Sequence, residues 1–215
     1  MNLKENHNRM SFFLLLLGIT TVATARAEVI ANYRSDFTQD TPADGWKYLS
    51  NADGEIGAAK NYKPLVWNSN ANGYTIKEDE FPLEGLGGYT VLGSGHGHPG
   101  RTPAEPGKGV AHYAIAAFTI PRNKNGKLSI TDSSIKRPLK SNDNEPEPGG
   151  KIEVRVYIND TLAHKQIVES SDDPASFDKK LGDVKSGDTI YIAIGPEEND
   201  GWDSFEIDFS LDLGR

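Results

Sequence analysis

The chain has 215 residues, a formal net charge of -8 at pH 7 and no cysteine. The acidic balance argues against a nucleic-acid-binding protein, because such binding depends on clustered Lys and Arg that neutralise phosphates. The lack of cysteine excludes disulfide stapling, thiolate metal sites and cysteine-based catalysis.

Residues 1–27 have the features of a secretory signal peptide. Lys4 and Arg9 lie in a short charged region, the apolar run SFFLLLLGITTV follows, and Ala25-Arg26-Ala27 resembles a cleavage site. The apolar run is too short for a comfortable membrane span of about 20 residues. We therefore expect a mature chain that starts near Glu28, is secreted or periplasmic and has no stable membrane insertion. An uncleaved anchor is the alternative.

The predicted mature chain, residues 28–215, has the length of one ordinary domain with room for a hydrophobic core. Loss of the signal removes three positive residues and one negative residue, which changes the formal charge from -8 to -10. Such a surface favours solubility, cations, and neutral or basic ligands.

Strand patterns dominate this domain. Residues 112–120 (HYAIAAFTI) come first, and residues 151–160 (KIEVRVYIND) alternate more cleanly between apolar and polar side chains. Residues 187–195 (GDTIYIAIG) place three isoleucines on one face, and residues 204–213 place phenylalanine, isoleucine and leucine opposite serine and acidic residues. These are the patterns of antiparallel strands that turn one face to a core.

Turn residues separate these runs, as in RNKNGK, EPEPGG and KSGD, and no stretch has a convincing helical period. The sequence therefore predicts an all-β, antiparallel β-sandwich of jelly-roll type. Residues 85–109 and 135–150 are rich in glycine and proline, so we expect both to be long loops rather than regular elements.

The late strands VRVYIND and SFDKKLGDVKSGDTIYIAIGPEENDGWDSFEIDFSL resemble jelly-roll modules of large secreted bacterial proteins. These modules accompany glycoside hydrolases and lyases and are similar to galactose-binding-like, carbohydrate-binding domains. The resemblance covers residues 110–211 and rests on pattern rather than on a catalytic motif. It implies a module that binds a polysaccharide or another glycan and does no chemistry.

The same resemblance implies a structural calcium ion held by carboxylates of the first and last strands. Calcium needs six to eight hard oxygen ligands, and the candidates are Asp36, Asp203 and Asp208, with Asn199 and Asp200 nearby. Any acidic loop contains the same residue types, so a solvated acidic loop is the alternative.

Sugar recognition needs flat aromatic faces together with a few polar groups that bind hydroxyls. The alternative for every aromatic residue is a place in the core or a cross-strand pair. The candidate ligand contacts are Trp46, Trp67 and Trp202, and, on the expected polar sheet face, Tyr157 and Tyr191.

The segment GSGHGHPG is the most unusual short piece of the chain. In a strand, His96 and His98 would face the same side, and with His112 or an acidic residue they could bind a transition metal. We count both histidines as candidate ligand contacts, and a plain surface or hinge segment is the other interpretation.

Two further functional classes compete with carbohydrate binding. A small polysaccharide lyase could use His112 or Tyr157 with Arg155, although no ordered motif supports catalysis and the acidic surface disfavours an anionic substrate. The other competing class is a structural or adhesion module that binds another protein. The sequence defines no oligomeric state.

Overall fold

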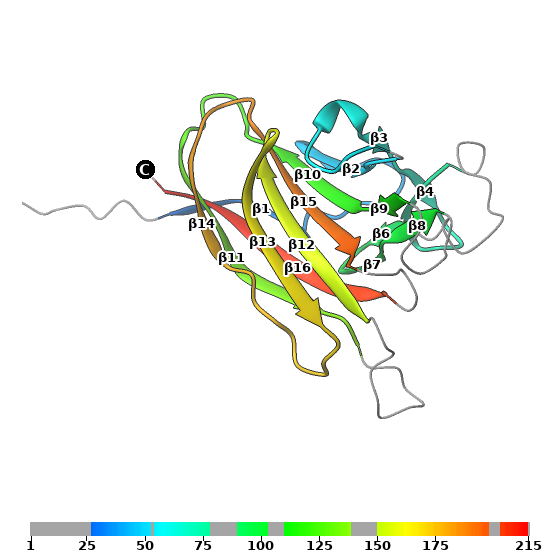
Figure 1. Ribbon diagram of the computed structural model, residues 1–215. Helices are drawn as coiled ribbons and strands as arrows, with labels where there is room; N and C mark the ends of the chain where they lie inside the picture. Colours follow the sequence, from blue (N-terminus) through cyan, green and yellow to red (C-terminus); the bar gives the residue numbers. More distant parts are fainter. Residues whose placement is uncertain are drawn as a thin grey trace, which may run out of the picture.

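The computed structural model describes residues 27–52, 54–77, 90–102, 110–138, 150–197 and 203–214. Nearly all of the predicted signal peptide falls outside these ranges, and so does Trp202. Two antiparallel sheets pack face to face (Figure 1), which confirms the predicted all-β sandwich. The jelly-roll type stays a prediction. In the described ranges no helix has the length and apolarity that a membrane crossing needs.

The larger sheet, called sheet A, contains the last strand at its centre and the first strand beside it. Its strands, in spatial order, are β14 (Lys179–Val184), β11 (Gly126–Lys136), β16 (Phe205–Gly214), β7 (His96–His98), β6 (Val91–Gly93), β5 (Gly73–Thr75) and β4 (Val66–Asn68), with β1 (Glu28–Asn32) paired to β16.

The opposing sheet, called sheet B, has its outer face partly covered by the segment that contains the single-turn element η1 (Ala59–Asn61). Its strands, in spatial order, are β13 (Thr161–Glu169), β12 (Lys151–Ile158), β15 (Thr189–Pro196), β10 (Ala114–Thr119), β2 (Trp46–Ser50) and β3 (Lys63–Pro64). A separate hairpin pairs β8 (Gly100–Thr102) with β9 (Val110–His112).

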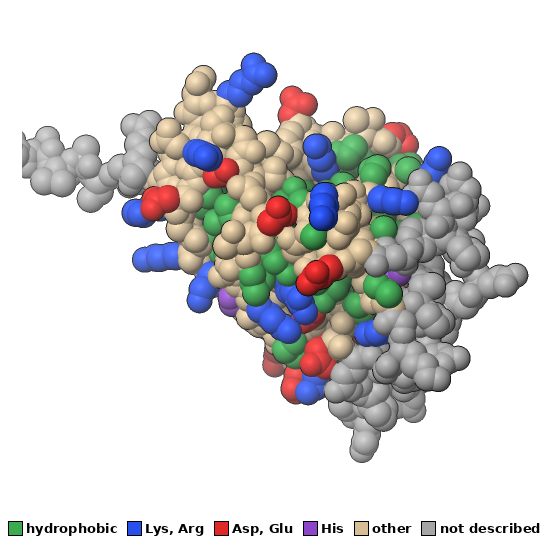
Figure 2. Space-filling model, turned by 45° about the horizontal axis from the view of Figure 1, so that its top comes forward, with side chains coloured by type: hydrophobic (Ala, Val, Ile, Leu, Met, Phe, Trp, Pro, Cys, Tyr) green, Lys and Arg blue, Asp and Glu red, His purple; other side chains and the backbone are tan. Residues whose placement is uncertain are grey.

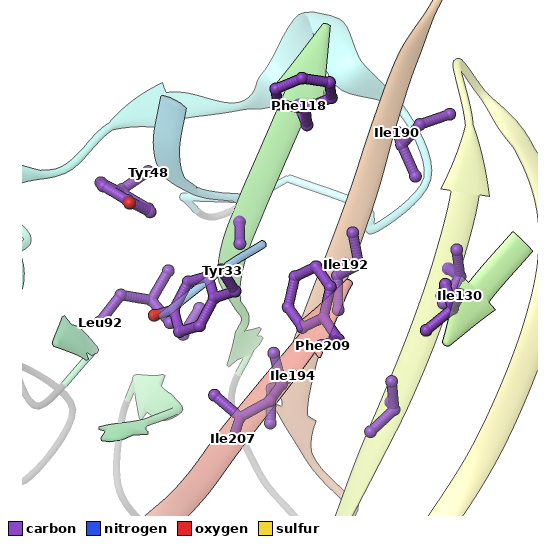
Figure 3. Close-up of a cluster of buried hydrophobic side chains, with 14 of the residues drawn as sticks. Tyr33, Tyr48, Leu92, Phe118, Ile130, Ile190, Ile192, Ile194, Ile207 and Phe209 are labelled. Carbon is purple, nitrogen blue, oxygen red and sulfur yellow. The ribbon is translucent and has the colours of Figure 1, made fainter. Parts of the chain in front are cut away.

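The core lies between the sheets and follows the alternation in the sequence. Every second residue of β16, from Phe205 to Leu213, is buried, with exposed fractions of 6% or less. Phe209 stacks on Tyr33 with ring centroids 5.2 Å apart, and Ile192 and Ile194 of sheet B also point into this region (Figure 3). The predicted core face of the last strand is therefore confirmed.

The prediction of one long loop over residues 85–109 is wrong where the structure describes it. β6, β7 and β8 all fall in this segment. Its glycines allow close packing rather than preventing strands: a Cβ atom built on Gly97 would lie 2.4 Å from the Phe205 ring. The loop predicted from Ile135 also begins later, because β11 continues to Lys136.

Candidate functional site

Trp46 lies in the core and not at a ligand surface. Its side chain is 4% exposed, and its indole packs at an angle on Phe118 at 5.1 Å. The indole Nε1 donates a hydrogen bond to Asp36 Oδ2 at 3.2 Å, which satisfies the polar edge of the ring. The prediction of a ligand contact at Trp46 is therefore corrected: its strand parity points the side chain inward.

Tyr157 and Tyr191 are cross-strand partners on the outer face of sheet B, as their shared parity predicts. They do not form an open platform. Gly57 lies against the Tyr157 ring, which is 4% exposed, and Tyr62 packs edge-on to Tyr191 at 5.2 Å. The segment around η1 thus covers the tyrosine pair, and Tyr157 is corrected from a surface contact to a buried residue.

Next to this pair, a buried carboxylate organises the outer face of sheet B. Glu153 lies 2.6 Å from Arg155 Nη2 and 2.7 Å from Lys165 Nζ, and it also accepts a hydrogen bond from the Tyr113 hydroxyl. The Arg155 guanidinium carbon lies 5.4 Å from the Tyr113 ring centroid. Both Glu153 oxygens thus have partners within the protein, whereas Arg155 Nε is buried without a hydrogen-bond partner among the described residues.

The network also bears on the lyase alternative. Burial, reinforced by the hydrogen bond to Glu153, raises the pKa of Tyr113 well above its ordinary value, so the phenol stays protonated at neutral pH. His112 is completely buried. A proton-abstracting base must reach its substrate, and neither His112 nor Tyr157 is at the surface.

The Glu153 network predicts a pH effect on stability. Burial alone would raise the pKa of Glu153, but hydrogen bonds from Lys165, Tyr113 and Arg155 outweigh it and lower the pKa. The resulting stabilisation is present above the ordinary glutamate pKa of about 4.3, and it is lost as the pH falls through the lowered pKa. The free energy of unfolding, measured in urea, should therefore fall more steeply below about pH 5 in the wild type than in Glu153→Gln.

Glu169 provides the matched control for that measurement. Its side chain is 73% exposed and pairs with Lys151 at 3.3 Å. Exposed pairs of this kind contribute little to stability, so Glu169→Gln should follow the wild-type pH profile. Equal profiles for wild type and Glu153→Gln would contradict the role given to the buried network.

The three aspartates of the calcium hypothesis have separate protein partners. Asp36 Oδ2 accepts a hydrogen bond from Asn32 N at 2.9 Å, and Asp208 Oδ1 accepts one from Arg34 N at 3.2 Å. Asp203 is buried and pairs with Arg137.

The structure brings the first and last strands together, as the calcium hypothesis requires, but the aspartates do not converge into a ligand set. Over the described ranges, no group of three or more His, Asp or Glu residues could hold a metal ion. By the same finding, the described residues do not complete a transition-metal site around His96 and His98. Asn199 and Asp200 lie outside the described residues, so calcium binding stays a prediction from the sequence.

His96 and His98 share one outward-facing side of a strand, as the sequence predicts for an extended backbone. Both line an open hollow of about 430 Å³ where β6, β7 and β16 meet. Val91 and Pro138 contribute apolar surface to it, and Glu206 contributes a carboxylate. His98 Nδ1 is hydrogen-bonded to the Pro99 carbonyl, which fixes the orientation of its ring.

Trp67 lines a second open groove, of about 550 Å³, at the edge of sheet A. Its partly buried indole is on the inner side of sheet A, where it packs against the core and edge-on to Tyr74 at 5.4 Å. Around it lie amide and hydroxyl groups and one cation: Asn68, Ser69, Asn70, Thr75 and Lys77. Asn68 Oδ1 accepts a hydrogen bond from Asn70 N at 3.0 Å and shapes the turn after β4.

Sequence reasoning found Trp67, His96 and His98 but missed most of the polar lining. The run WNSN, which begins with Trp67, contains the amides, and an aromatic residue followed by Asn and Ser is a pattern that could have indicated them. Glu206 could not have been found, because it reaches the hollow through a pairing of β16 with β7 that is remote in sequence.

No family model matches this chain, and no curated protein matches it.

Proposed function

We propose that this protein is a secreted or periplasmic, non-catalytic carbohydrate-binding module that holds its ligand beside β4, at the edge of sheet A. The observation that carries the proposal is the Trp67 groove, which combines an aromatic ring with neutral hydrogen-bonding groups in an open hollow of about 550 Å³. The predicted signal peptide supports export.

The chemistry of this groove matches that of a sugar. A pyranose ring offers an apolar C–H face that suits an indole, and its hydroxyls both donate and accept hydrogen bonds. Asn70 and Ser69 are exposed beside Trp67, so they can bind hydroxyls without opening the fold. Neutral amides and hydroxyls suit a neutral sugar better than a strongly charged one.

The charge distribution also favours a neutral ligand. On the described part of the face drawn in Figure 2, basic and acidic side chains are interspersed, with apolar side chains between them. A strongly anionic polymer would be favoured by a surface of one positive sign, and the formal charge of the whole chain is -8.

The proposal is tested by affinity electrophoresis of the mature chain in gels that contain laminarin, xylan, mannan or galactan. We expect retardation by at least one polysaccharide. Asn70→Ala should weaken that binding about 2- to 10-fold, the effect of losing one hydrogen bond. Gln166→Ala, an amide variant on β13 of sheet B, is the matched control and should bind like the wild type.

Two results would contradict the proposal. Retention by none of the four polysaccharides would remove carbohydrate binding from the account. Release of an unsaturated product, seen as rising ultraviolet absorbance, would instead indicate lyase chemistry.

A further inference from the structure

We propose that two copies of this chain pair through the free edge of β13, so that sheet B continues from one copy into the other. The pairing is antiparallel, and its twofold axis passes through Ile167. This inference concerns assembly and does not depend on sugar binding.

β13 is an edge strand whose far side is unpaired. Within sheet B it pairs with β12, and none of the other described strands pairs with its far side. Figure 1 shows β13 beyond β12, at the margin of sheet B. The bridge between Ser170 and Arg137 begins only after β13 ends. Unpaired N–H and C=O groups along such an edge can accept a strand from another chain.

β13 also lacks the features that block edge pairing, whereas the edge strand β14 of sheet A has them. Proteins protect sheet edges with β-bulges that twist the edge away, or with proline. β14 contains Gly182 at a φ of 111° and a register shift against β11. From His164 to Glu169, β13 pairs with β12 in unbroken register and contains neither glycine nor proline. This stretch is therefore regular enough to accept a further strand.

The outer face of this regular stretch has an apolar side chain at its centre and opposite charges on either side. Ile167 is 38% exposed. Lys165 and Glu169 lie two residues before and after it, so they share its face. Their side chains are 45% and 73% exposed. The edge thus presents a cation, an apolar group and an anion in that order.

A twofold axis through Ile167 makes this edge self-complementary. In an antiparallel pair with twofold symmetry, residues at equal distances on either side of the axis oppose each other. Ile167 then opposes Ile167 of the second copy, and each Lys165 opposes a Glu169. An axis at Lys165 would oppose two lysines, and an axis at Gln166 or Val168 would oppose no pair of opposite charges. Charge therefore selects the register centred on Ile167.

The ion pairs within one chain are compatible with this register. Lys165 Nζ lies 2.7 Å from Glu153 Oε2, and Lys151 Nζ lies 3.3 Å from Glu169 Oε1. An ammonium group has three donors and a carboxylate has several acceptor positions, so each can take a second partner. One strand edge buries less than the roughly 800 Å² per partner of a standard interface. We therefore expect a weak dimer, with a dissociation constant on the order of 10–100 µM.

Sedimentation equilibrium of the mature chain from about 1 to 300 µM measures the assembly. We expect a monomer–dimer equilibrium. Glu169→Lys should raise the dissociation constant at least about 10-fold, because it opposes two lysines at both ends of the junction. Glu55→Lys is the charge-matched control, since Glu55 is exposed outside β13, and it should dimerise at least as well as the wild type. A wild type that stays monomeric over this range would overturn the proposal.

Cysteine cross-linking tests the register, because the chain has no cysteine of its own. The axis brings the two copies of residue 167 within disulfide distance, so Ile167→Cys should form covalent dimers under mild oxidation. Leu162→Cys, at an exposed position of the same strand, is the matched control and should cross-link at least about 10-fold more slowly. Equal cross-linking rates for the two variants would refute pairing through this register of β13.

Discussion

Arg137→Ala is expected to lower the free energy of unfolding by about 3–5 kcal/mol, the cost of breaking a buried ion pair by removing one partner. Arg137 Nε lies 3.0 Å from Asp203 Oδ1, and the two side chains are 3% and 0% exposed. Arg137 also donates a hydrogen bond to Ser170 Oγ. The substitution would leave the Asp203 carboxylate buried without this partner.

The pair sits where several parts of the sandwich meet. Arg137 directly follows β11, Asp203 precedes β16, and Ser170 follows β13 of the other sheet. Ser170 Oγ in turn donates to the Gly150 carbonyl at 2.9 Å, next to the start of β12. The ion pair therefore joins the ends of β11 and β16 within sheet A, and the hydrogen bond from Arg137 to Ser170 links this end of sheet A to sheet B.

Urea denaturation at neutral pH measures the effect. Asp203→Asn should also be strongly destabilising, whereas the double variant Arg137→Met/Asp203→Leu should recover much of the loss because it removes both charges. If the free energy of unfolding of Arg137→Ala lay within about 1 kcal/mol of the wild-type value, the pair would not have the anchoring role assigned to it.

Phe209→Ala should lower the free energy of unfolding by a similar amount, about 3–5 kcal/mol, because it opens a cavity at the centre of the core. The Phe209 side chain is fully buried. Its ring stacks on Tyr33 at 5.2 Å and contacts Phe177 edge-on at 5.9 Å. It also contacts the Trp46 ring of sheet B edge-on at 6.1 Å, so alanine at this position removes aromatic contacts across to the opposing sheet as well.

Leu162→Ala is the control for that variant, since the Leu162 side chain is 49% exposed on β13. Surface substitutions of this kind usually change stability by less than about 0.5 kcal/mol. Equal unfolding midpoints for Phe209→Ala and wild type in urea would contradict the packing described for this core.

Local alternation explains why the fold class could be predicted from the sequence. In β16 the residues from Phe205 to Leu213 repeat with period two, and a strand with one buried face produces that period directly. The short strands β6 and β7 have three residues each, too few to establish a period, and their glycines resemble loop residues. Their assignment depends on partners remote in sequence.

The same difference between local pattern and distant packing decides which site residues could be predicted from the sequence. Trp67, His96 and His98 could be named from composition, but Trp46 and Tyr157 could not be assigned correctly without tertiary structure. Trp46 is covered by the opposing sheet, and Tyr157 by a segment about 100 residues earlier in the chain. Residue type gives the chemistry available to a site, whereas exposure depends on what packs over each face.

The most direct test of the central claim is a map of backbone amide chemical shifts in the mature chain, recorded with and without a bound neutral oligosaccharide. The account predicts that the perturbed amides cluster in β4, in β5 and in the turn that joins them. Perturbations confined to the outer face of sheet B, around β12 and β13, would contradict the assignment of the binding face, and no perturbation by any oligosaccharide would contradict carbohydrate binding itself.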